Sequence, residues 1–262
     1  MIRRVLACFL LVIAAFRGLA AEPSLPAGLE PAGTAIVQSV IDGDSLMLAD
    51  GRTVRMVGIQ APKLPKGRPN FAEWPFAREA QQALAGLVQG RAVTLYFGGT
   101  PQDRYGRVLA QLVRDDGLWV QGELIRGGFA RVYTFPDNRA AAPEMLALER
   151  EARAEKRGLW ADPFFAIHTP EEAGRYTGDL VLVEGKIVDG ARTANAVFLN
   201  FGADWHTAFT LRLNSEALRQ FRSDKVDPLA LIGATVRVRG YIRRDRERAI
   251  MDITHPEEIE RL

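Results

Sequence analysis

Alternating apolar and polar residues predict a β-hairpin over residues 41–63. Gly43 forms a tight turn, Asp50-Gly51 is a strong two-residue hairpin signal, and the second strand covers residues 54–57. Paired strands lie about 4.8 Å apart, so we expect this hairpin to gather acidic and basic side chains into one small area. Beyond it, the pattern predicts helices over residues 76–88, 118–127 and 143–156 and strands over residues 92–97, 108–113 and 129–133.

A second group of strand patterns begins after residues 167–178, where Pro170, Gly174 and Gly178 predict a linker. The order of the predicted elements is three strands, one helix and two strands. This is the element order of an OB-fold, a small barrel that often binds oligonucleotides or oligosaccharides. The elements are strands over residues 180–188, 196–201, 208–213, 234–242 and 248–254, and a helix over residues 215–221. The second domain is therefore predicted to cover residues 179–262.

Residues 1–21 predict a secretory signal peptide. Two arginines precede an apolar run over residues 5–16, and Gly18-Leu19-Ala20 resembles a cleavage site. The run is too short to span a bilayer well, so a retained anchor is the less favoured alternative. We expect export to the periplasm or the extracellular space, with no stable membrane anchor after cleavage. Residues 22–34, rich in proline and glycine, predict a flexible lead-in.

The charge balance changes when the predicted signal peptide is set aside. The chain has 34 basic and 32 acidic residues, and residues 1–21 contain three arginines and no acid, which leaves a net charge of −1. A mature chain of this charge has no global attraction for nucleic acid, so binding must come from local patches. The only cysteine, Cys8, lies in the predicted signal peptide. Glu149 and Arg153, one helical turn apart, are expected to belong to a solvated helix face.

The hairpin over residues 41–63 resembles the staphylococcal nuclease (thermonuclease) family. The resemblance continues at Asp103 to Ala110, at Leu124 to Tyr133 and at Gly158 to Trp160, and it predicts a domain over residues 35–166. The family implies a five-stranded OB-type barrel with three helices that cleaves DNA and RNA with calcium. We therefore predict a mainly β protein with helices (α+β), in which a nuclease-like OB barrel precedes a second OB-like barrel.

The resemblance assigns roles to four residues of the first barrel. It implies that Asp44 is a metal ligand, that Asp42 is a nearby acid, and that Arg55 and Arg107 contact phosphate. Arginine suits phosphate because its planar fork donates two hydrogen bonds to one group. Without the resemblance, the residues favour a structural alternative. In that interpretation Arg55 and Arg107 form ion pairs with Asp42 and Asp103.

The chain departs from the family at two positions of the expected site. Gln60 replaces an aspartate ligand, and Lys63 replaces the glutamate usually assigned as the general base. Calcium accepts amide oxygens, so Gln60 weakens a calcium site without excluding it. A protonated Lys63 repels a cation and cannot accept a proton from water. Glu73, in the divergent insertion over residues 65–75, is a candidate replacement base, although a solvated glutamate is the default interpretation.

The second barrel offers a candidate contact surface for nucleic acid. Segments such as Val183 to Val188 and Val236 to Ile242 resemble OB-type nucleic-acid-binding modules appended to exported nucleases. Trp205 is either a stacking platform for bases or a hairpin residue packed on a neighbouring strand. An arginine-rich segment is either a phosphate-contacting patch or a solvated hairpin. Its members are Arg237, Arg239, Arg243, Arg244, Arg246 and Arg248.

Three hypotheses for function follow from these residues. The first is a metal-dependent phosphodiesterase that acts on nucleic acid. The second is a catalytically inactive protein of the same fold that binds nucleic acid or another polyanion. The absent general base favours the second hypothesis, whereas the retained Asp44, Arg55 and Arg107 argue against complete loss of the site. The third is an interaction module of the cell envelope.

Overall fold

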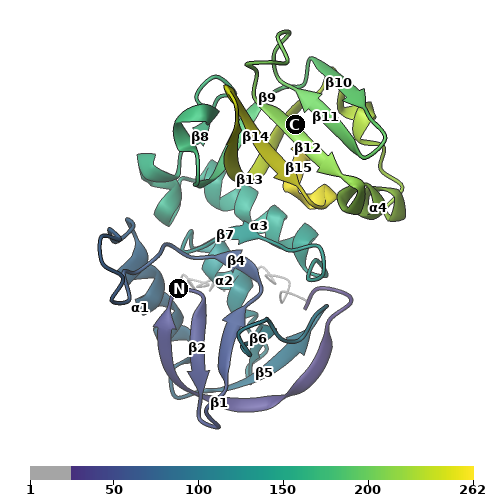
Figure 1. Ribbon diagram of the computed structural model, residues 1–262. Coiled ribbons are helices and arrows are strands. Elements are labelled where there is room, and N and C mark those ends of the chain that lie inside the picture. Colours follow the sequence, from purple (N-terminus) through teal and green to yellow (C-terminus); the bar gives the residue numbers. More distant parts are fainter. Residues whose placement is uncertain (1–24) are drawn as a thin grey trace, which may run out of the picture.

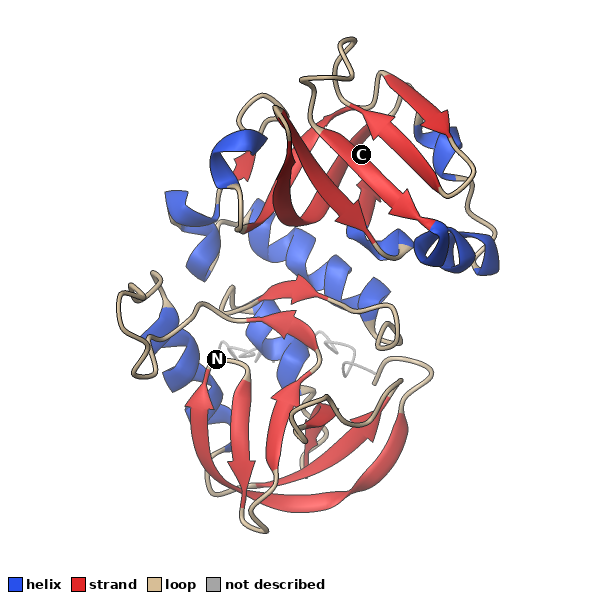
Figure 2. Ribbon diagram, in the orientation of Figure 1, coloured by secondary structure: helices blue, strands red, loops and turns tan. Residues whose placement is uncertain are grey.

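A computed structural model describes residues 25–262 as two β-rich halves with helix α3 (Ala142–Ala154) between them (Figure 1). The predicted signal peptide and the start of the predicted lead-in lie outside the described residues. Within residues 25–262, no helix has the length and apolar character needed to cross a membrane. Strands dominate both halves, and helices lie at their edges and between them (Figure 2).

The first barrel is a closed five-stranded sheet in the order β1-β2-β3-β6-β5. Neighbouring strands are antiparallel except β3 and β6, which are parallel. Inward side chains such as Leu46, Val54 and Leu95 are fully buried. The strands are β1 (Glu30–Asp42), β2 (Ser45–Leu48), β3 (Thr53–Met56), β5 (Ala92–Phe97) and β6 (Val108–Arg114), and the helices are α1 (Ala77–Val88) and α2 (Val120–Arg126). The predicted fold class is confirmed.

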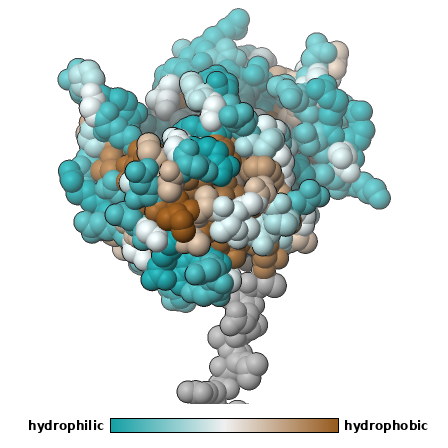
Figure 3. All heavy atoms as spheres, turned by 90° about the horizontal axis from the view of Figure 1, so that it is seen from below, coloured by the Kyte–Doolittle hydropathy of each residue, from teal (hydrophilic) through white to brown (hydrophobic). Residues whose placement is uncertain are grey.

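The flexible lead-in predicted over residues 22–34 is wrong for its last five residues. Strand β1 begins at Glu30, which pairs with Phe97, and Thr34 pairs with Thr94. The physical reason is that β5 has a backbone edge that this segment pairs with, which closes the barrel. Seen from below, this half presents a group of hydrophobic residues bordered by hydrophilic ones (Figure 3).

The second half holds one large sheet with β12 and β14 parallel. Its strand order is β10 (Asp189–Arg192), β11 (Ala196–Asn200), β12 (Thr210–Asn214), β14 (Arg248–Ile253), β13 (Thr235–Asp245), β9 (Leu180–Lys186) and β8 (Ile167–His168). Strands β9 and β10 lie near opposite ends of this order, although only Ile187 and Val188 separate them in the chain. The amide of Ile187 donates to the carbonyl of Ala234, and the amide of Val188 donates to the carbonyl of Asn200. The two strands therefore behave as one bent strand that bonds to both sides of the sheet. This arrangement is compatible with the predicted OB-like barrel.

The elements of the second half include three short strands that the sequence pattern did not predict. They are β8 (Ile167–His168), β10 (Asp189–Arg192) and β15 (Ile259–Arg261). The others are β9 (Leu180–Lys186), β11 (Ala196–Asn200), β12 (Thr210–Asn214), α4 (Ser215–Ser223), β13 (Thr235–Asp245) and β14 (Arg248–Ile253). Short 3-10 helices lie at Gly158–Ala161, Pro163–Phe165, Ala173–Tyr176, Pro228–Leu231 and Pro256–Glu258.

The linker predicted over residues 167–178 is instead part of the second half. Strand β8 pairs in parallel with β9 through Ile167 and Leu182. Ala173, in a 3-10 helix, is fully buried in the second hydrophobic core. Proline and glycine interrupt the periodicity here because the segment turns toward the second half. It packs against the second hydrophobic core and is therefore an ordered part of that half.

A buried ionic network joins the two halves through α3. Arg239 of β13 donates to the Glu149 carboxylate of α3 at 2.8 Å and to the backbone oxygen of Val132 at 3.0 Å. Glu260 of β15 accepts a hydrogen bond from Arg153 of α3 at 3.0 Å. Glu149 is 0% exposed, so the predicted solvated face is wrong. The second half covers this face of the helix, and its charges are neutralised across the interface.

Candidate functional site

Asp44 lies fully buried in the turn between β1 and β2. Its amide donates to the Asp42 Oδ1 atom at 3.1 Å, the local contact that favours aspartate in turns. A Cβ atom at Gly43 would lie 2.6 Å from the Cβ of Ala61 and 2.8 Å from that of Ala80. Glycine therefore lets this turn pack against α1 and the segment after β4, which fixes the position of the carboxylate.

Three hydrogen-bond donors and one guanidinium surround the Asp44 carboxylate. Lys63 Nζ lies 2.6 Å from Oδ2, and the Ala61 amide donates to the same oxygen at 2.8 Å. Arg55 Nη2 lies 3.4 Å from Oδ2, and Ser45 Oγ donates to Oδ1 at 3.2 Å. Lys63 therefore points into the site, and both oxygens of the carboxylate are engaged by groups of the protein.

Two positive charges keep Asp44 ionised despite its burial. Burial alone would raise the pKa of Asp44, but Arg55 and Lys63 outweigh it and hold this pKa well below its usual range. Burial lowers the pKa of Lys63, and the Asp44 carboxylate opposes that change. The favoured state of the pair is an ammonium in contact with a carboxylate.

Arg55 is held chiefly by backbone oxygens. Its Nη2 donates to the carbonyl of Ile59 at 2.6 Å, and its Nη1 donates to the carbonyl of Met56. Its ion pair is with Asp44, whereas the structural alternative drawn from the sequence paired it with Asp42. Arg55 thus stabilises the turn between β3 and β4, where β4 covers Gly58–Gln60, while its guanidinium faces the Asp44 carboxylate.

Arg107 and Lys66 are the more exposed cations near the site, and each pairs with one aspartate. Arg107 Nη2 lies 2.7 Å from Asp103 Oδ2, and the Arg107 side chain is 37% exposed. This is the pairing that the structural alternative predicted for Arg107. Its guanidinium also lies 5.7 Å from the ring centroid of Tyr105. Asp42 pairs with Lys66, a residue of the divergent insertion, and Lys66 is 39% exposed.

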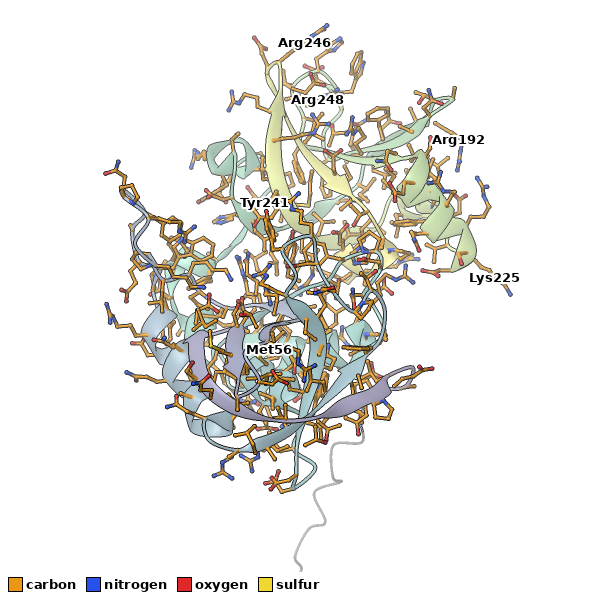
Figure 4. The ribbon with its side chains drawn as sticks, turned by 60° about the horizontal axis from the view of Figure 1, so that its bottom comes forward. Met56, Arg192, Lys225, Tyr241, Arg246 and Arg248 are labelled. Atoms are coloured by element: carbon orange, nitrogen blue, oxygen red, sulfur yellow. The ribbon has the colours of Figure 1, made fainter. Side chains whose placement is uncertain are left out.

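Gln60 and Glu73 each have partners away from Asp44. Gln60 Oε1 accepts from Arg131 Nη2 at 2.8 Å, and Gln60 Nε2 donates to the Tyr241 hydroxyl at 3.4 Å. Tyr241 belongs to β13 and lies where the two halves meet (Figure 4). Both carboxylate oxygens of Glu73 contact the guanidinium of Arg78, each at 2.9 Å.

The arginine patch predicted on the second barrel does not form one surface. Arg239 is 2% exposed and bonded to Glu149, so its assignment to a phosphate-contacting patch is wrong. The reason is that its face of β13 packs against α3. Four other predicted members have partners within the protein: Arg237 with Glu184 at 2.7 Å, Arg243 with Asp252 at 2.6 Å, Arg244 with the carbonyl of Gly174 at 3.1 Å, and Arg248 with Asp245 at 3.0 Å.

Comparison with known proteins places the first half in a family. A model described as "Staphylococcal nuclease homologue" matches residues 53–162. An "Uncharacterized endonuclease" of Escherichia coli is 35% identical over 130 residues, which cover 48% of this chain and 76% of that protein. The chain belongs to the staphylococcal nuclease family. "Protein ParB" of Escherichia coli is 38% identical over 144 residues, covering 48% of this chain and 72% of that protein. "Endonuclease YhcR" of Bacillus subtilis is 29% identical over 177 residues, covering 60% and 14% respectively.

The residues present do not fit the calcium site that the staphylococcal nuclease family implies. Calcium takes about six to eight oxygen ligands. Here the Asp44 carboxylate is bonded to Lys63, Asp42 is paired with Lys66, and the Gln60 amide is bonded to Arg131 and to Tyr241 of the second half. Across residues 25–262, no three or more His, Cys, Asp or Glu side chains are grouped to hold a metal ion.

Sequence reasoning missed three contributors to this nuclease-like site. Ser45 and the Ala61 amide bond to Asp44, and Lys66 pairs with Asp42. The contact of Ser45 could have been predicted, because its hydroxyl follows Asp44 directly in the chain and can donate to that carboxylate. The contact of Lys66 could not, since it depends on how the insertion folds back over the turn.

Proposed function

We propose that this protein binds nucleic acid through its phosphate groups and does not hydrolyse it by a metal-dependent mechanism. The observation that carries the proposal is the 2.6 Å contact between Lys63 Nζ and Asp44 Oδ2. The ammonium supplies positive charge beside the fully buried Asp44 carboxylate. A protonated lysine cannot act as a general base for water.

The charges around the turn favour an anionic ligand. Arg55, Lys63 and Lys66 face the two carboxylates of the Asp42-Gly43-Asp44 turn, so cations are in excess there. Ion pairs near the surface are worth about 0–1 kcal/mol, so the partly exposed pair of Arg107 with Asp103 costs little to exchange for a phosphate. The planar fork of Arg107 suits a phosphate oxygen pair. Membership of a nuclease family supports nucleic acid as the source of those phosphates.

Phosphodiester hydrolysis is the second candidate, because two of the related proteins are named endonucleases. A hydrolase built on this site needs a base other than Lys63. Glu73 lies in the neighbouring insertion, and it would have to leave Arg78 to serve. This rearrangement distinguishes the second candidate from the first.

The test is an assay of the full chain against labelled single- and double-stranded DNA and RNA, with calcium, magnesium, manganese or chelator. The double variant Arg55→Ala/Arg107→Ala is compared with Arg52→Ala, which removes an exposed arginine of the same hairpin. We expect no metal-dependent cleavage. We also expect binding that weakens as salt rises and is reduced only in the double variant.

Two outcomes would replace this proposal. Cleavage that chelator stops and the double variant lacks would establish the hydrolase, and Glu73→Gln would then test its base. Absence of both cleavage and binding would leave the third hypothesis, an interaction module of the cell envelope.

A further inference from the structure

The second barrel carries a cleft of about 330 Å³ that lies apart from the nuclease-like site. Its walls come from β10, β11, the loop between β11 and β12, and the start of β14. The side chains that matter for its chemistry are two aromatic rings, one guanidinium, one amide and one carboxylate. They are Phe198, Trp205, Arg248, Asn200 and Asp189.

The aromatic rings of the cleft flank a cation. The guanidinium carbon of Arg248 lies 5.8 Å from the ring centroid of Trp205 and 5.9 Å from that of Phe198. Both distances lie within about 6 Å, the range of cation–π attraction. Trp205 is also stacked on His206, with ring centroids 3.7 Å apart and planes inclined by 29°. These contacts fix the tryptophan ring while leaving it 53% exposed, which is unlike a residue packed on a neighbouring strand.

One residue of the cleft lining offers a hydrogen-bond donor. Asn200 lines the cleft and is 4% exposed. Its Oδ1 accepts a hydrogen bond from Thr210 Oγ1 at 2.9 Å. Among the hydrogen bonds of residues 25–262, none uses the Asn200 NH₂ group as a donor, so that group is left for a ligand. A ligand with an acceptor such as a carbonyl oxygen can pair with this group.

One cation lines the cleft, and it is Arg248. Arg248 and Arg246 lie on the second half at its far side from the first barrel (Figure 4). Arg248 is paired with Asp245 at 3.0 Å, and the Asp245 side chain is half exposed. A phosphate can therefore approach this pair from solvent. An exposed aromatic face beside a guanidinium suits a flat base joined to a phosphate chain better than a neutral sugar chain.

We propose that this cleft binds one unpaired base of a single-stranded nucleic acid. The base stacks on Trp205, Asn200 donates to a carbonyl oxygen on its edge, and a flanking phosphate contacts Arg248. This proposal rests on the proposed function, because it assigns a second contact for the same polynucleotide. A duplex keeps its bases stacked inside, so it does not use the cleft.

The test measures binding of the full chain to three labelled probes: a single-stranded oligothymidylate, a duplex of the same length, and an abasic strand with the same number of phosphates. The intrinsic tryptophan fluorescence is recorded in parallel. Stacking of one base on an aromatic side chain corresponds to roughly a 5- to 150-fold change in affinity. We expect the oligothymidylate to bind more tightly than the abasic strand by a factor in this range and to quench the fluorescence.

The variants separate stacking from charge. We expect Trp205→Ala to bind the oligothymidylate no better than the abasic strand, and Trp205→Phe to restore most of the difference. Phe164→Ala removes an aromatic ring of similar exposure on a different surface and should behave as the wild type. Thermal unfolding verifies that each variant is folded.

Each remaining outcome overturns one proposal or both. If Trp205→Ala binds all probes as the wild type does, the cleft proposal is wrong, while a loss of binding in Arg55→Ala/Arg107→Ala still supports the proposed function. Saturation of the cleft by a neutral hexasaccharide, with no quenching by oligothymidylate, would assign the cleft to a sugar chain instead. If no probe binds the wild type, both proposals are wrong.

Discussion

Lys63 and Asp44 form the contact that separates this site from a metal centre. The lysine places its charge 2.6 Å from a fully buried carboxylate, and Arg55 adds a second charge at 3.4 Å. Because the ion pair is buried, its loss would leave an uncompensated charge, which costs several kcal/mol in comparable sites. Lys63 therefore stabilises the turn and also sets the charge of the site.

Lys63→Glu should convert this contact into a weak cation site. Two carboxylates would then face each other, so the variant should be less stable than the wild type in chelator. Calcium should raise its melting temperature by a few degrees, since a ligand at about 100 times its dissociation constant stabilises by roughly 2.7 kcal/mol. Differential scanning fluorimetry with a calcium titration measures this.

The wild type and Lys186→Glu, which changes an exposed lysine of β9, serve as controls. Neither should respond to calcium. A response of the wild type equal to that of Lys63→Glu would mean that the site accepts the ion as it stands.

The sequence predicted which residues gather at this turn but not all of their partners. The Asp-Gly-Asp turn and the hairpin signal were enough to bring Asp44 and Arg55 together. The partner of Arg55 depends on register: β2 and β3 pair Ser45 with Arg55, which directs the guanidinium toward Asp44 and not Asp42. A local pattern carries no information on such a difference of one or two residues.

At the scale of secondary-structure elements, β13 carries one arginine that is buried against α3 and another that is more exposed. Arg239 is buried against Glu149 of α3, whereas Arg237, two residues earlier on β13, pairs with Glu184 in a more exposed position. The two arginines lie at alternate positions of one strand, so the sequence pattern treats them alike. The sequence pattern therefore predicted the strand and the helix correctly, and it could not distinguish an interface from a solvated face.

Arg239→Ala should lower the free energy of unfolding by about 3–5 kcal/mol, because it leaves the buried carboxylates of Glu149 and Glu260 with only one of their two shared cations, Arg153. Arg237→Ala is the matched control on the same strand and should cost about 1 kcal/mol or less. Urea denaturation followed by circular dichroism measures both values. Equal losses in the two variants would contradict the burial difference.

At the scale of the whole molecule, two titratable groups of the C-terminal segment give stability an opposing dependence on pH. Burial raises the pKa of Glu258 to about 7. Burial, together with Arg139 and Arg239, lowers the pKa of His255 to about 4. The imidazole Nε2 of His255 is also hydrogen-bonded to Thr134 of the first half at 2.7 Å, so these groups belong to the contact between halves.

The signs follow from proton binding. The folded state holds a proton on Glu258 that the unfolded state releases above pH 4.5, so this contribution to stability falls as pH rises toward 7. His255 does the reverse between about pH 4 and 6.5, because only the unfolded state is protonated there. Below pH 6.5 the two groups change stability with pH in opposite directions. Above pH 6.5 only Glu258 still contributes to the change.

Glu258→Gln removes the contribution of Glu258 to the pH dependence of stability. It keeps an acceptor for the Thr254 amide, which donates to Glu258 at 2.6 Å. Between pH 5 and pH 8 the stability of the wild type should fall relative to that of the variant by about 3 kcal/mol. Urea unfolding of both proteins at the two pH values measures this difference. Parallel pH profiles would show that Glu258 titrates normally.

The position of Gln60 has a consequence for how the two halves vary in sequence. Its amide bonds to Arg131 and to Tyr241 of the second half, at the position where the family resemblance implies a metal ligand. An aspartate there would place a shorter, charged side chain beside Arg131 and would lose the contact with Tyr241. A change that adds a metal ligand to the first half would thus weaken its attachment to the second. Substitutions at Gln60 are therefore constrained by both halves.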